Sequence, residues 1–592
     1  MLSLGSRPPE RALYTPEVLR VIPPQVLSSE QLNKISSLVS SGITPLSAAF
    51  CVVRKIYDPP SFLRPTLGEL PFPFKLPGIQ EGCGIVVNAR KDSERPKAFI
   101  ASDFDADGIT SAAIVHSALS SLGFEVTAKT PCRQREGYGF NTRLLDEAVR
   151  SGAKILFLLD FGTQQKELIE KGKRRGLEII VIDHHLCSAE DRASPNALVN
   201  PRGVSSHCTF MSAGGLSYLF CLGLCEAFPA VKFNQKEWLG LAAVSTVADV
   251  VPLIEQNRAV VRHGLAYIRE SRGLLMLANK LHLTGEITPS DVAFRLAPTM
   301  NAPGRIVEKG GDLVLKLLTL SADVSAEASA DMSAATELEA GMLIGCNTAR
   351  KRREKLDLAL AEKIIASTGL HRAIVVADDR FDPGIAGLVA ARLVERYHRP
   401  AAVIAMCERS GGRSSVRGVP NFDTYLALHK CRELLVRFGG HLAAAGFTIT
   451  NSNVRLFTIA FAAEAERQLG NFTPLIISAD FSTSAKELNH GVAKLLDGLR
   501  ACEPFGSCHP APIWFVPQVK LLKVHEIAVH HLLLEFVGVD GKFAAYLFNN
   551  PKHPIKMKCG ETLDIGVKLS RARLSQDGGG ATELIEFCGI SN

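Results

Sequence analysis

Short apolar runs alternate with helical segments between residues 97 and 200, and this alternation limits the possible folds more than any other feature. The apolar runs cover residues 98–102, 124–128, 155–159, 178–182 and 197–199, and helical segments lie at 110–122, 141–151 and 164–173. Alternating strands and helices predict a parallel sheet with helices on both faces. The fold class that we expect is therefore α/β, with ligands bound beyond the carboxyl ends of the strands.

The chain has 592 residues, too many for one ordinary core. Proline-rich sequence before residue 80 predicts a short helical lead-in with an irregular path. Residues 326–367 contain few helix breakers and many charges, and they predict a long connecting helix, interrupted near Gly341. Short strands with glycine-rich turns after residue 510, including Gly578–Gly580, predict a small β-barrel or sandwich. The expected units are a lead-in (1–80), a catalytic domain (81–325), the connecting helix (326–370), a second α/β domain (371–470) and the β unit (471–592).

Composition places the chain among globular proteins, since 46% of its residues are hydrophobic and 21% are charged. The net charge of +7 is weak support for a polyanionic partner. The 14 cysteines include no Cys-x-x-Cys pair, which argues against a zinc ribbon and favours a reducing, cytoplasmic location. We see no secretory signal and no apolar run of about 20 residues, so we expect no membrane association.

Three aspartates at alternate positions, Asp103, Asp105 and Asp107, directly follow the first apolar run. Carboxylates this close repel one another unless a cation lies among them. Carboxylate oxygens are hard ligands that suit Mg²⁺ or Mn²⁺. The alternative interpretation is a solvated acidic turn.

Further acids follow later apolar runs, at Asp160, in the sequence Asp183-His184-His185, and at Asp249. A single aspartate at such a place is often a turn or helix-capping residue. Several strand ends in one parallel sheet nevertheless meet at the same edge. Imidazole mixed with carboxylate suits Mn²⁺ well, and a site with this many ligands can hold two metal ions that hydrolyse a phosphodiester. A further carboxylate would orient the histidine rings.

The pattern Asp-x-Asp-x-Asp-Gly, a strand-end Asp, Asp-His-His and a later Ala-Asp resembles the four motifs of the DHH phosphoesterase superfamily. Within it, the chain resembles the RecJ exonucleases from about residue 62 onward. The stretches that favour this subgroup are residues 133–139, 257–258, 264–265, 296–305, 383–387, 415–417 and 439–446. The resemblance implies a DHH parallel-sheet domain, a second α/β (DHHA1) domain and a C-terminal oligonucleotide-binding (OB) barrel.

The resemblance also implies roles for individual residues. The implied metal ligands are Asp105, Asp107, Asp160, His184, His185 and Asp249, and the implied catalytic residues are Asp103, Asp107, His184 and His441. Asp103 would be a ligand or lie just behind the ligands, and His441 would contact the scissile phosphate. The residues implied to hold the terminal 5′-phosphate and DNA are Arg133, Arg305, Ser415 and Arg417. The alternatives are a plain surface position for Arg133 and a simple tight turn at Gly439–Gly440.

Some positions carry open or unusual features. Trp514, Phe515, Phe536 and Phe543 are candidates for base stacking in the barrel, although core packing is the favoured interpretation. The basic run Arg350–Arg353 is either a solvated helix face or a phosphate-facing one. The chain departs from the family pattern at Phe161, at Asp382 and at residues 508–510, and the Asp382 change puts a substrate contact in doubt.

We therefore predict a single-stranded-DNA-specific 5′-to-3′ exonuclease of recombination and repair that uses Mn²⁺ or Mg²⁺, two ions per site. The cleft between its α/β domains would be too narrow for duplex DNA. The resemblance implies a monomer that a helicase or single-strand-binding protein supplies with substrate. The alternatives are a phosphodiesterase for short oligoribonucleotides or cyclic dinucleotides, a metal-dependent pyrophosphatase, and an inactive DNA-binding scaffold. The length and the intact ligand set disfavour them.

Overall fold

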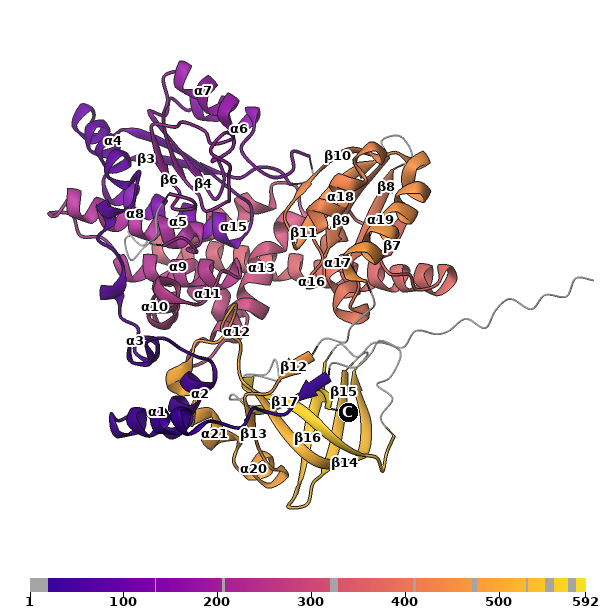
Figure 1. Ribbon diagram of the computed structural model, residues 1–592. Helices are drawn as coiled ribbons and strands as arrows, with labels where there is room; N and C mark the ends of the chain where they lie inside the picture. Colours follow the sequence, from indigo (N-terminus) through magenta and orange to yellow (C-terminus); the bar gives the residue numbers. More distant parts are fainter. Residues whose placement is uncertain are drawn as a thin grey trace, which may run out of the picture.

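The computed structural model describes residues 20–133, 135–204, 208–319, 328–407, 411–470, 476–528, 531–548, 558–572 and 582–591. Three sheets organise this part of the chain (Figure 1). An α/β body and a smaller α/β body are joined by one long helix, and a β-barrel lies below them in the view. No helix among the described residues has the length and apolar character needed to cross a membrane.

The first sheet is fully parallel with the strand order β3-β2-β4-β5-β6. Its strands are β2 (Lys97–Ser102), β3 (Glu125–Lys129), β4 (Ile155–Leu159), β5 (Glu178–Ile182) and β6 (Ala197–Val199). One face packs on α4 (Ile79–Asp92), α5 (Ala106–Ser121) and α8 (Ala213–Ala227). The other face packs on α6 (Thr142–Arg150) and α7 (Lys166–Arg174). Because both faces are covered, β4 is buried along its whole length, and the predicted doubly covered parallel sheet is confirmed.

A helical layer follows this sheet and completes the first body. Its first members are α9 (Gln235–Ala248) and α10 (Glu255–Gly264). It continues through η3 (Leu265–Glu270), α11 (Arg272–Lys280), α12 (Pro289–Asp291), the π-helical turn η4 (Val292–Leu296), α13 (Ala297–Asn301), α14 (Pro303–Ile306) and α15 (Gly310–Leu318). Helices α5, α8 and α9 contribute many of the residues in the large core of this body.

The long helix α16 (Ala328–Thr368) connects the two α/β bodies (Figure 1). The predicted interruption near Gly341 is wrong, because the helix runs through it. A single glycine costs a helix interior only about 1 kcal/mol, and contacts of Ala340 and Leu343 with the large core hold the helix at this point.

The second body has a mixed sheet with the order β10-β11-β9-β8-β7. Only β7 (Ile374–Asp378) and β8 (Ala401–Cys407) are parallel, and β9 (Gly411–Arg417), β11 (Ala444–Ile449) and β10 (Leu435–Gly440) add antiparallel strands. The helices are α17 (Ala386–Tyr397) on one face, and α18 (Thr424–Lys430) and α19 (Val454–Leu469) on the other, with short turns η5 (Arg432–Leu434) and η6 (Asn451–Asn453).

The C-terminal strands form a closed barrel, as predicted. They are β14 (Ile513–Ala528), β15 (His531–Val537), β16 (Lys542–Leu547), β17 (Thr562–Ala572) and β18 (Thr582–Ser591), and a bridge between β16 and β18 closes the ring. Short elements beside it are β12 (Ile476–Ser478), β13 (Phe481–Ser482), α20 (Ala485–His490), α21 (Val492–Gly498) and η7 (Arg500–Cys502). The core packing predicted for Trp514, Phe515, Phe536 and Phe543 is confirmed, because all four are buried. The predicted turn at 578–580 lies outside the described residues.

The N-terminal lead-in is helical, as predicted, with α1 (Ser29–Ser40), α2 (Pro45–Val53), α3 (Pro59–Leu63), η1 (Leu67–Glu69) and η2 (Pro73–Lys75). The lead-in is also an integral part of the C-terminal unit. Its strand β1 (Arg20–Ile22) joins the C-terminal sheet between β12 and β18, and Phe50 and Cys51 enter the core of the barrel. The two ends of the described chain therefore share one core.

Candidate metal centre and phosphate clamp

The acids predicted from the sequence follow neighbouring strands of the first sheet. Asp103 comes directly after β2, Asp160 after β4 and Asp183 after β5. Since these strands are adjacent and parallel, their carboxyl ends meet at one edge. Asp249 reaches the same site from elsewhere: it is the C-cap of helix α9, not a strand end.

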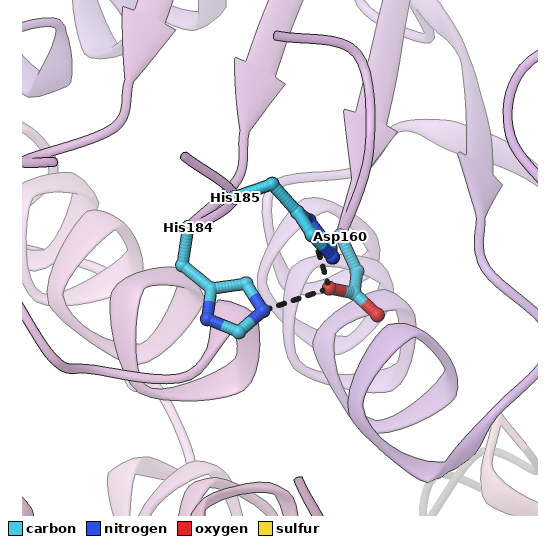
Figure 2. Close-up of side chains that lie close together, drawn as sticks. All are labelled: Asp160, His184 and His185. Atoms are coloured by element: carbon cyan, nitrogen blue, oxygen red, sulfur yellow. Dashed lines mark ion pairs between the residues drawn. The ribbon is translucent and has the colours of Figure 1, made fainter. Parts of the chain in front are cut away.

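Three groups of possible metal ligands lie together at this edge. They are Asp160 with His184 and His185, Asp107 with His184 and Asp249, and Asp103 with Asp105 and Asp160, and within each group the ligand atoms are within 4.8 Å of one another. Figure 2 shows both imidazole rings turned toward the Asp160 carboxylate. The Nε2 atom of His184 is 3.2 Å from Oδ1 of Asp160 and 3.6 Å from carboxylate oxygens of both Asp107 and Asp249.

The electrostatics of this edge fit a cation. Burial, and after it the neighbouring carboxylates, raise the pKa of Asp103 and of Asp160, and the same two causes raise the pKa of Asp249 to about 8. Oδ1 of Asp103, Oδ1 of Asp160 and Nδ1 of His184 are buried and have no hydrogen-bond partner in the described part of the chain. Buried polar atoms normally have partners. Crowded carboxylates and imidazoles whose lone pairs accept no hydrogen bond are the donor set expected of a divalent-metal site.

Backbone N–H groups hold two of the aspartates in place. Asp105 is the N-cap of α5, where its side chain accepts hydrogen bonds from the N–H groups of Asp107 and Gly108. Asp107 accepts from the N–H groups of Ala213 (3.0 Å) and Gly214 (2.9 Å) at the start of α8. Helix N-termini favour negative charge, so the fold fixes both carboxylates before any metal binds.

The sequence argument quoted Asp183 within a motif but assigned it no role. In the structure its Oδ1 lies 2.7 Å from Nδ1 of His185, and its Oδ2 accepts hydrogen bonds from the N–H and hydroxyl of Thr163. Burial alone would lower the pKa of His185, but the Asp183 carboxylate raises it to about 9. Asp183 is therefore the carboxylate that orients this ring. Its place at the end of β5 was the signal that could have identified it.

Tyr138 was also not singled out. Its hydroxyl donates to the Asp160 carbonyl oxygen at 2.9 Å, and its ring meets His185 edge-on with centroids 5.8 Å apart. The residue lies in the 133–139 loop that carried part of the family resemblance, and 55% of it is exposed. An aromatic side chain thus borders the metal ligands on the solvent side.

Basic residues from both α/β bodies gather next to the acidic edge. Arg133 lies with its guanidinium carbon 5.2 Å from the Phe104 ring centroid, and burial lowers its pKa, although Asp103 and Asp105 act in the opposite direction. Burial, and after it the nearby charges of Arg133, Arg350 and Arg417, lower the pKa of Arg305 to about 9. Positive charges that depress one another's pKa are typical of a site that receives an anion.

Ser415 and Arg417 line the start of helix α17 in the second body. A Cβ built on Gly387 would lie 3.2 Å from Oγ of Ser415 and 3.1 Å from Nη2 of Arg417, so both side chains lie against the first turn of that helix. A hydroxyl, a guanidinium and a helix N-terminus form a suitable cradle for a phosphate. His441 lies in the turn between β10 and β11, where it is exposed and its backbone N–H donates to the Ala444 carbonyl oxygen, and its role stays a prediction.

The other positions at which the sequence left a question, Asp382, Phe161 and the basic run on α16, have local structural explanations. Oδ1 of Asp382 accepts from the Gly384 N–H at 2.7 Å and so shapes the loop before α17. Phe161 is buried and packs on Phe140. The basic run on α16 is neither wholly exposed nor wholly buried. Arg350 is buried against Glu354, whereas Lys351 and Arg352 are exposed.

Family models match three segments of the chain: the DHH family N-terminal domain (residues 97–246), the DHHA1 domain (370–467) and the RecJ OB domain (479–576). The RecJ single-stranded-DNA-specific exonuclease of Haemophilus influenzae is 30% identical over 480 residues, which cover 76% of this chain and 79% of that protein. The chain belongs to the RecJ family.

Other RecJ proteins support this membership. The Bacillus subtilis protein is also 30% identical over 84% of this chain, but the chain spans only 62% of that longer relative. Crystal structures of Thermus thermophilus RecJ with Mn²⁺ and with Mg²⁺ superpose with TM-scores of 0.76 and 0.71 at 23% identity, covering 97% of this chain and 79% and 78% of theirs. The Thermus thermophilus protein thus shares the fold of this chain over almost all of its length. The predicted domain boundaries themselves stay a prediction.

Proposed function

We propose that the chain is a metal-dependent exonuclease that removes nucleotides from the 5′ end of single-stranded DNA. The observation that carries this proposal is the meeting of two unlike sets of side chains. A buried cluster of carboxylates and imidazoles lies next to a basic cradle, and Arg133 interacts electrostatically with both Asp103 and Arg417. Membership of a family of single-stranded-DNA-specific exonucleases supports single-stranded DNA as the substrate.

The metal ligands would be Asp105, Asp107, Asp160, His184, His185 and Asp249, and they would hold two ions. Bound Mn²⁺ or Mg²⁺ supplies an activated water and neutralises charge on the phosphodiester. Asp103, which is buried among these ligands, would help to fix them or bind directly. His441 would donate a hydrogen bond to the scissile phosphate from the second body.

The cradle supports the proposed direction of cleavage. Ser415, Arg417, Arg133 and Arg305 would bind the terminal 5′-phosphate, because a guanidinium fork recognises a phosphate bidentately. A terminal phosphate held beside the metal ligands places the first phosphodiester over them, which is the condition for release of mononucleotides. The OB barrel would bind the strand farther from its end.

The finer biology is also proposed. The enzyme would act as a cytoplasmic monomer in recombination and repair, on strands supplied by a helicase or a single-strand-binding protein. The catalytic domain, connecting helix, DHHA1 domain and OB domain would follow the boundaries at residues 81, 326, 371 and 471.

The deciding experiment follows a 5′-labelled single strand with Mn²⁺ and compares wild type with Asp105→Ala and His184→Ala. His371→Ala, which removes an exposed imidazole, is the matched control. We expect early release of the label as a mononucleotide, abolished in both ligand variants and kept in the control. A 3′-labelled strand and a duplex serve as substrate controls. An absence of cleavage with either metal would favour an inactive scaffold, and cleavage only of short oligoribonucleotides would favour the smaller-substrate phosphodiesterases.

A further inference from the structure

One face of the DHHA1 sheet continues beyond the phosphate cradle. Along β9, Ser415 and Arg417 lie on the same face as Arg413, because alternate residues of a strand share a face. The antiparallel register places Thr448 of β11 beside Arg413, and Arg437 of β10 beside Thr448. Three strands therefore present one polar row at this level of the sheet.

Between this row and the cradle, the face is made of small residues. Ser415 pairs with Gly446, and Gly446 pairs with Gly439. A Cβ built on Gly439 would meet no atom within 4 Å, and one on Gly446 would meet only a backbone oxygen at 3.2 Å. The surface at Gly439 is therefore open, bordered by the cradle on one side and the polar row on the other.

The polar row carries exposed positive charge. Arg413 and Arg437 are both exposed, and Nε of Arg437 donates to Oγ1 of Thr448 at 3.2 Å. That bond orients the guanidinium along the sheet but leaves its charge uncompensated, since within the described ranges no carboxylate forms an ion pair with Arg437. An oriented guanidinium without an acidic partner is suited to a phosphate.

The opposite face of the same strands is different. Phe438 and Phe447 point to the side covered by α18 and α19, where Phe447 is part of the core. The face that carries Arg437 has no aromatic side chain on β9, β10 or β11. This face is therefore built to contact a charged backbone and not to stack bases.

We propose that this face is a backbone track for single-stranded DNA, in which Arg437, supported by Thr448, contacts a phosphate outside the terminal nucleotide. Arg413 flanks the track, and the open surface at Gly439 lets the strand lie flat on the sheet. This inference rests on the proposed function of the neighbouring cradle. The track adds a phosphate contact that needs a longer strand but not a strand end. Because phosphate contacts carry no sequence information, this contact does not depend on base sequence.

The first test compares two substrates, a 5′-phosphorylated dinucleotide and a 20-mer of thymidylate, with Mn²⁺. The dinucleotide occupies only the cradle and the scissile position. Arg437→Gln is expected to raise KM for the 20-mer about 10-fold, the value of one charged hydrogen bond, and to leave KM for the dinucleotide unchanged. Arg432→Gln is the matched control, because Arg432 is a nearby exposed arginine that pairs with Glu433. Equal effects on both substrates, or none on the 20-mer, would overturn the track.

The second test needs no catalysis. Binding of the 20-mer in EDTA is measured against salt concentration, and Arg437→Gln should lower the slope of log Kd against log salt by about 0.7, the value for one phosphate on a single strand. A Cβ added at Gly439 meets no atom within 4 Å, so Gly439→Val should extend into the open surface and weaken binding, whereas Gly341→Ala on α16, also in open space, should not. Unchanged slope and binding would refute the track. Normal binding with no hydrolysis by wild type would instead refute the proposed nuclease.

Discussion

The sheets of the two α/β bodies present opposite charges near one site, although the first body also supplies Arg133 and Arg305. The DHH sheet is parallel and collects carboxylates at the ends of β2, β4 and β5. The DHHA1 sheet is mostly antiparallel and presents arginines along the face of β9. Acids at strand ends converge on a point, which suits an ion. Basic residues along a strand face form a row, which suits a polymer.

The difference also appears in burial. Asp103 and Asp160 are each 3% exposed, and their pKa values are raised, so that the acidic half is unfavourable without a compensating cation. Arg413 and Arg437 are exposed. We infer that the acidic cluster destabilises the metal-free fold and that metal binding relieves this, whereas the exposed Arg413 and Arg437 cost the fold little.

The largest expected effect tests this inference directly. Asp160→Asn removes one crowded carboxylate, so activity should fall more than about 100-fold, beyond the loss typical of residues that only orient ligands. The melting temperature of the metal-free protein should rise, because repulsion is relieved. Mn²⁺ should stabilise wild type more than the variant.

Nuclease assays and thermal melts in EDTA and in Mn²⁺ measure both quantities. Asp146→Asn, which alters an exposed carboxylate paired with Arg175, is the control. A lower metal-free melting temperature for Asp160→Asn would show that the carboxylate cluster is not under strain.

The strand-end acids could be predicted from sequence because the constraint is local: an apolar run followed by Asp, repeated in an alternating pattern. Asp249 looked the same in sequence, yet it ends a helix. An apolar run alone does not distinguish a buried strand from a buried helix.

Long-range pairing explains what the sequence could not reveal. Strand β1 pairs with residues 476–478 and with Ile590, and nothing within residues 20–22 specifies those partners. The basic track was hidden for the same reason, since Arg413, Thr448 and Arg437 become neighbours only through the register of three strands.

A second prediction concerns the residue behind the ligands. Asp183→Asn should keep the packing but lose the charge that orients His185, and activity at limiting Mn²⁺ should fall about 10- to 100-fold. Excess Mn²⁺ should restore much of it, because affinity is the property that is lost. Titration of activity with Mn²⁺ measures this, with Asp191→Asn, in an exposed loop, as the control. A loss that no Mn²⁺ concentration repairs would give Asp183 a direct part in the chemistry.

A third prediction addresses the basic half. Arg417→Gln should raise KM about 10-fold for strands with a 5′-phosphate, the equivalent of one charged hydrogen bond. KM for strands with a 5′-hydroxyl should not change, because they lack the group that is recognised. Arg455→Gln, at an exposed position of α19, is the control. Equal loss on both substrates would place Arg417 away from the terminal phosphate.

The smallest effect is on stability and compares two histidines. Asp183 raises the pKa of His185 to about 9, whereas burial, aided by Arg258, lowers the pKa of His509 to about 4. His509 packs against Phe62 and Phe505 and donates from Nε2 to the Cys502 carbonyl oxygen, so it is neutral in the fold. Below a pH of about 6.5, His509 binds a proton in the unfolded chain but stays neutral in the folded protein. Stability from this group is therefore complete above that pH and is lost as the pH falls toward 4, by at most about 3 kcal/mol.

His509→Gln keeps a donor but cannot titrate. The difference in unfolding free energy between wild type and this variant, measured by urea denaturation, should therefore shrink as the pH falls from 7 to 4. Exposed His371 gives the control variant His371→Ala, whose difference from wild type should stay nearly constant over this range. A constant difference for His509→Gln would mean that the buried ring accepts its proton without opening the junction between the lead-in and the barrel. Burial would then not lower the pKa of His509, and the contrast with His185, whose pKa is raised by Asp183, would lose its second half.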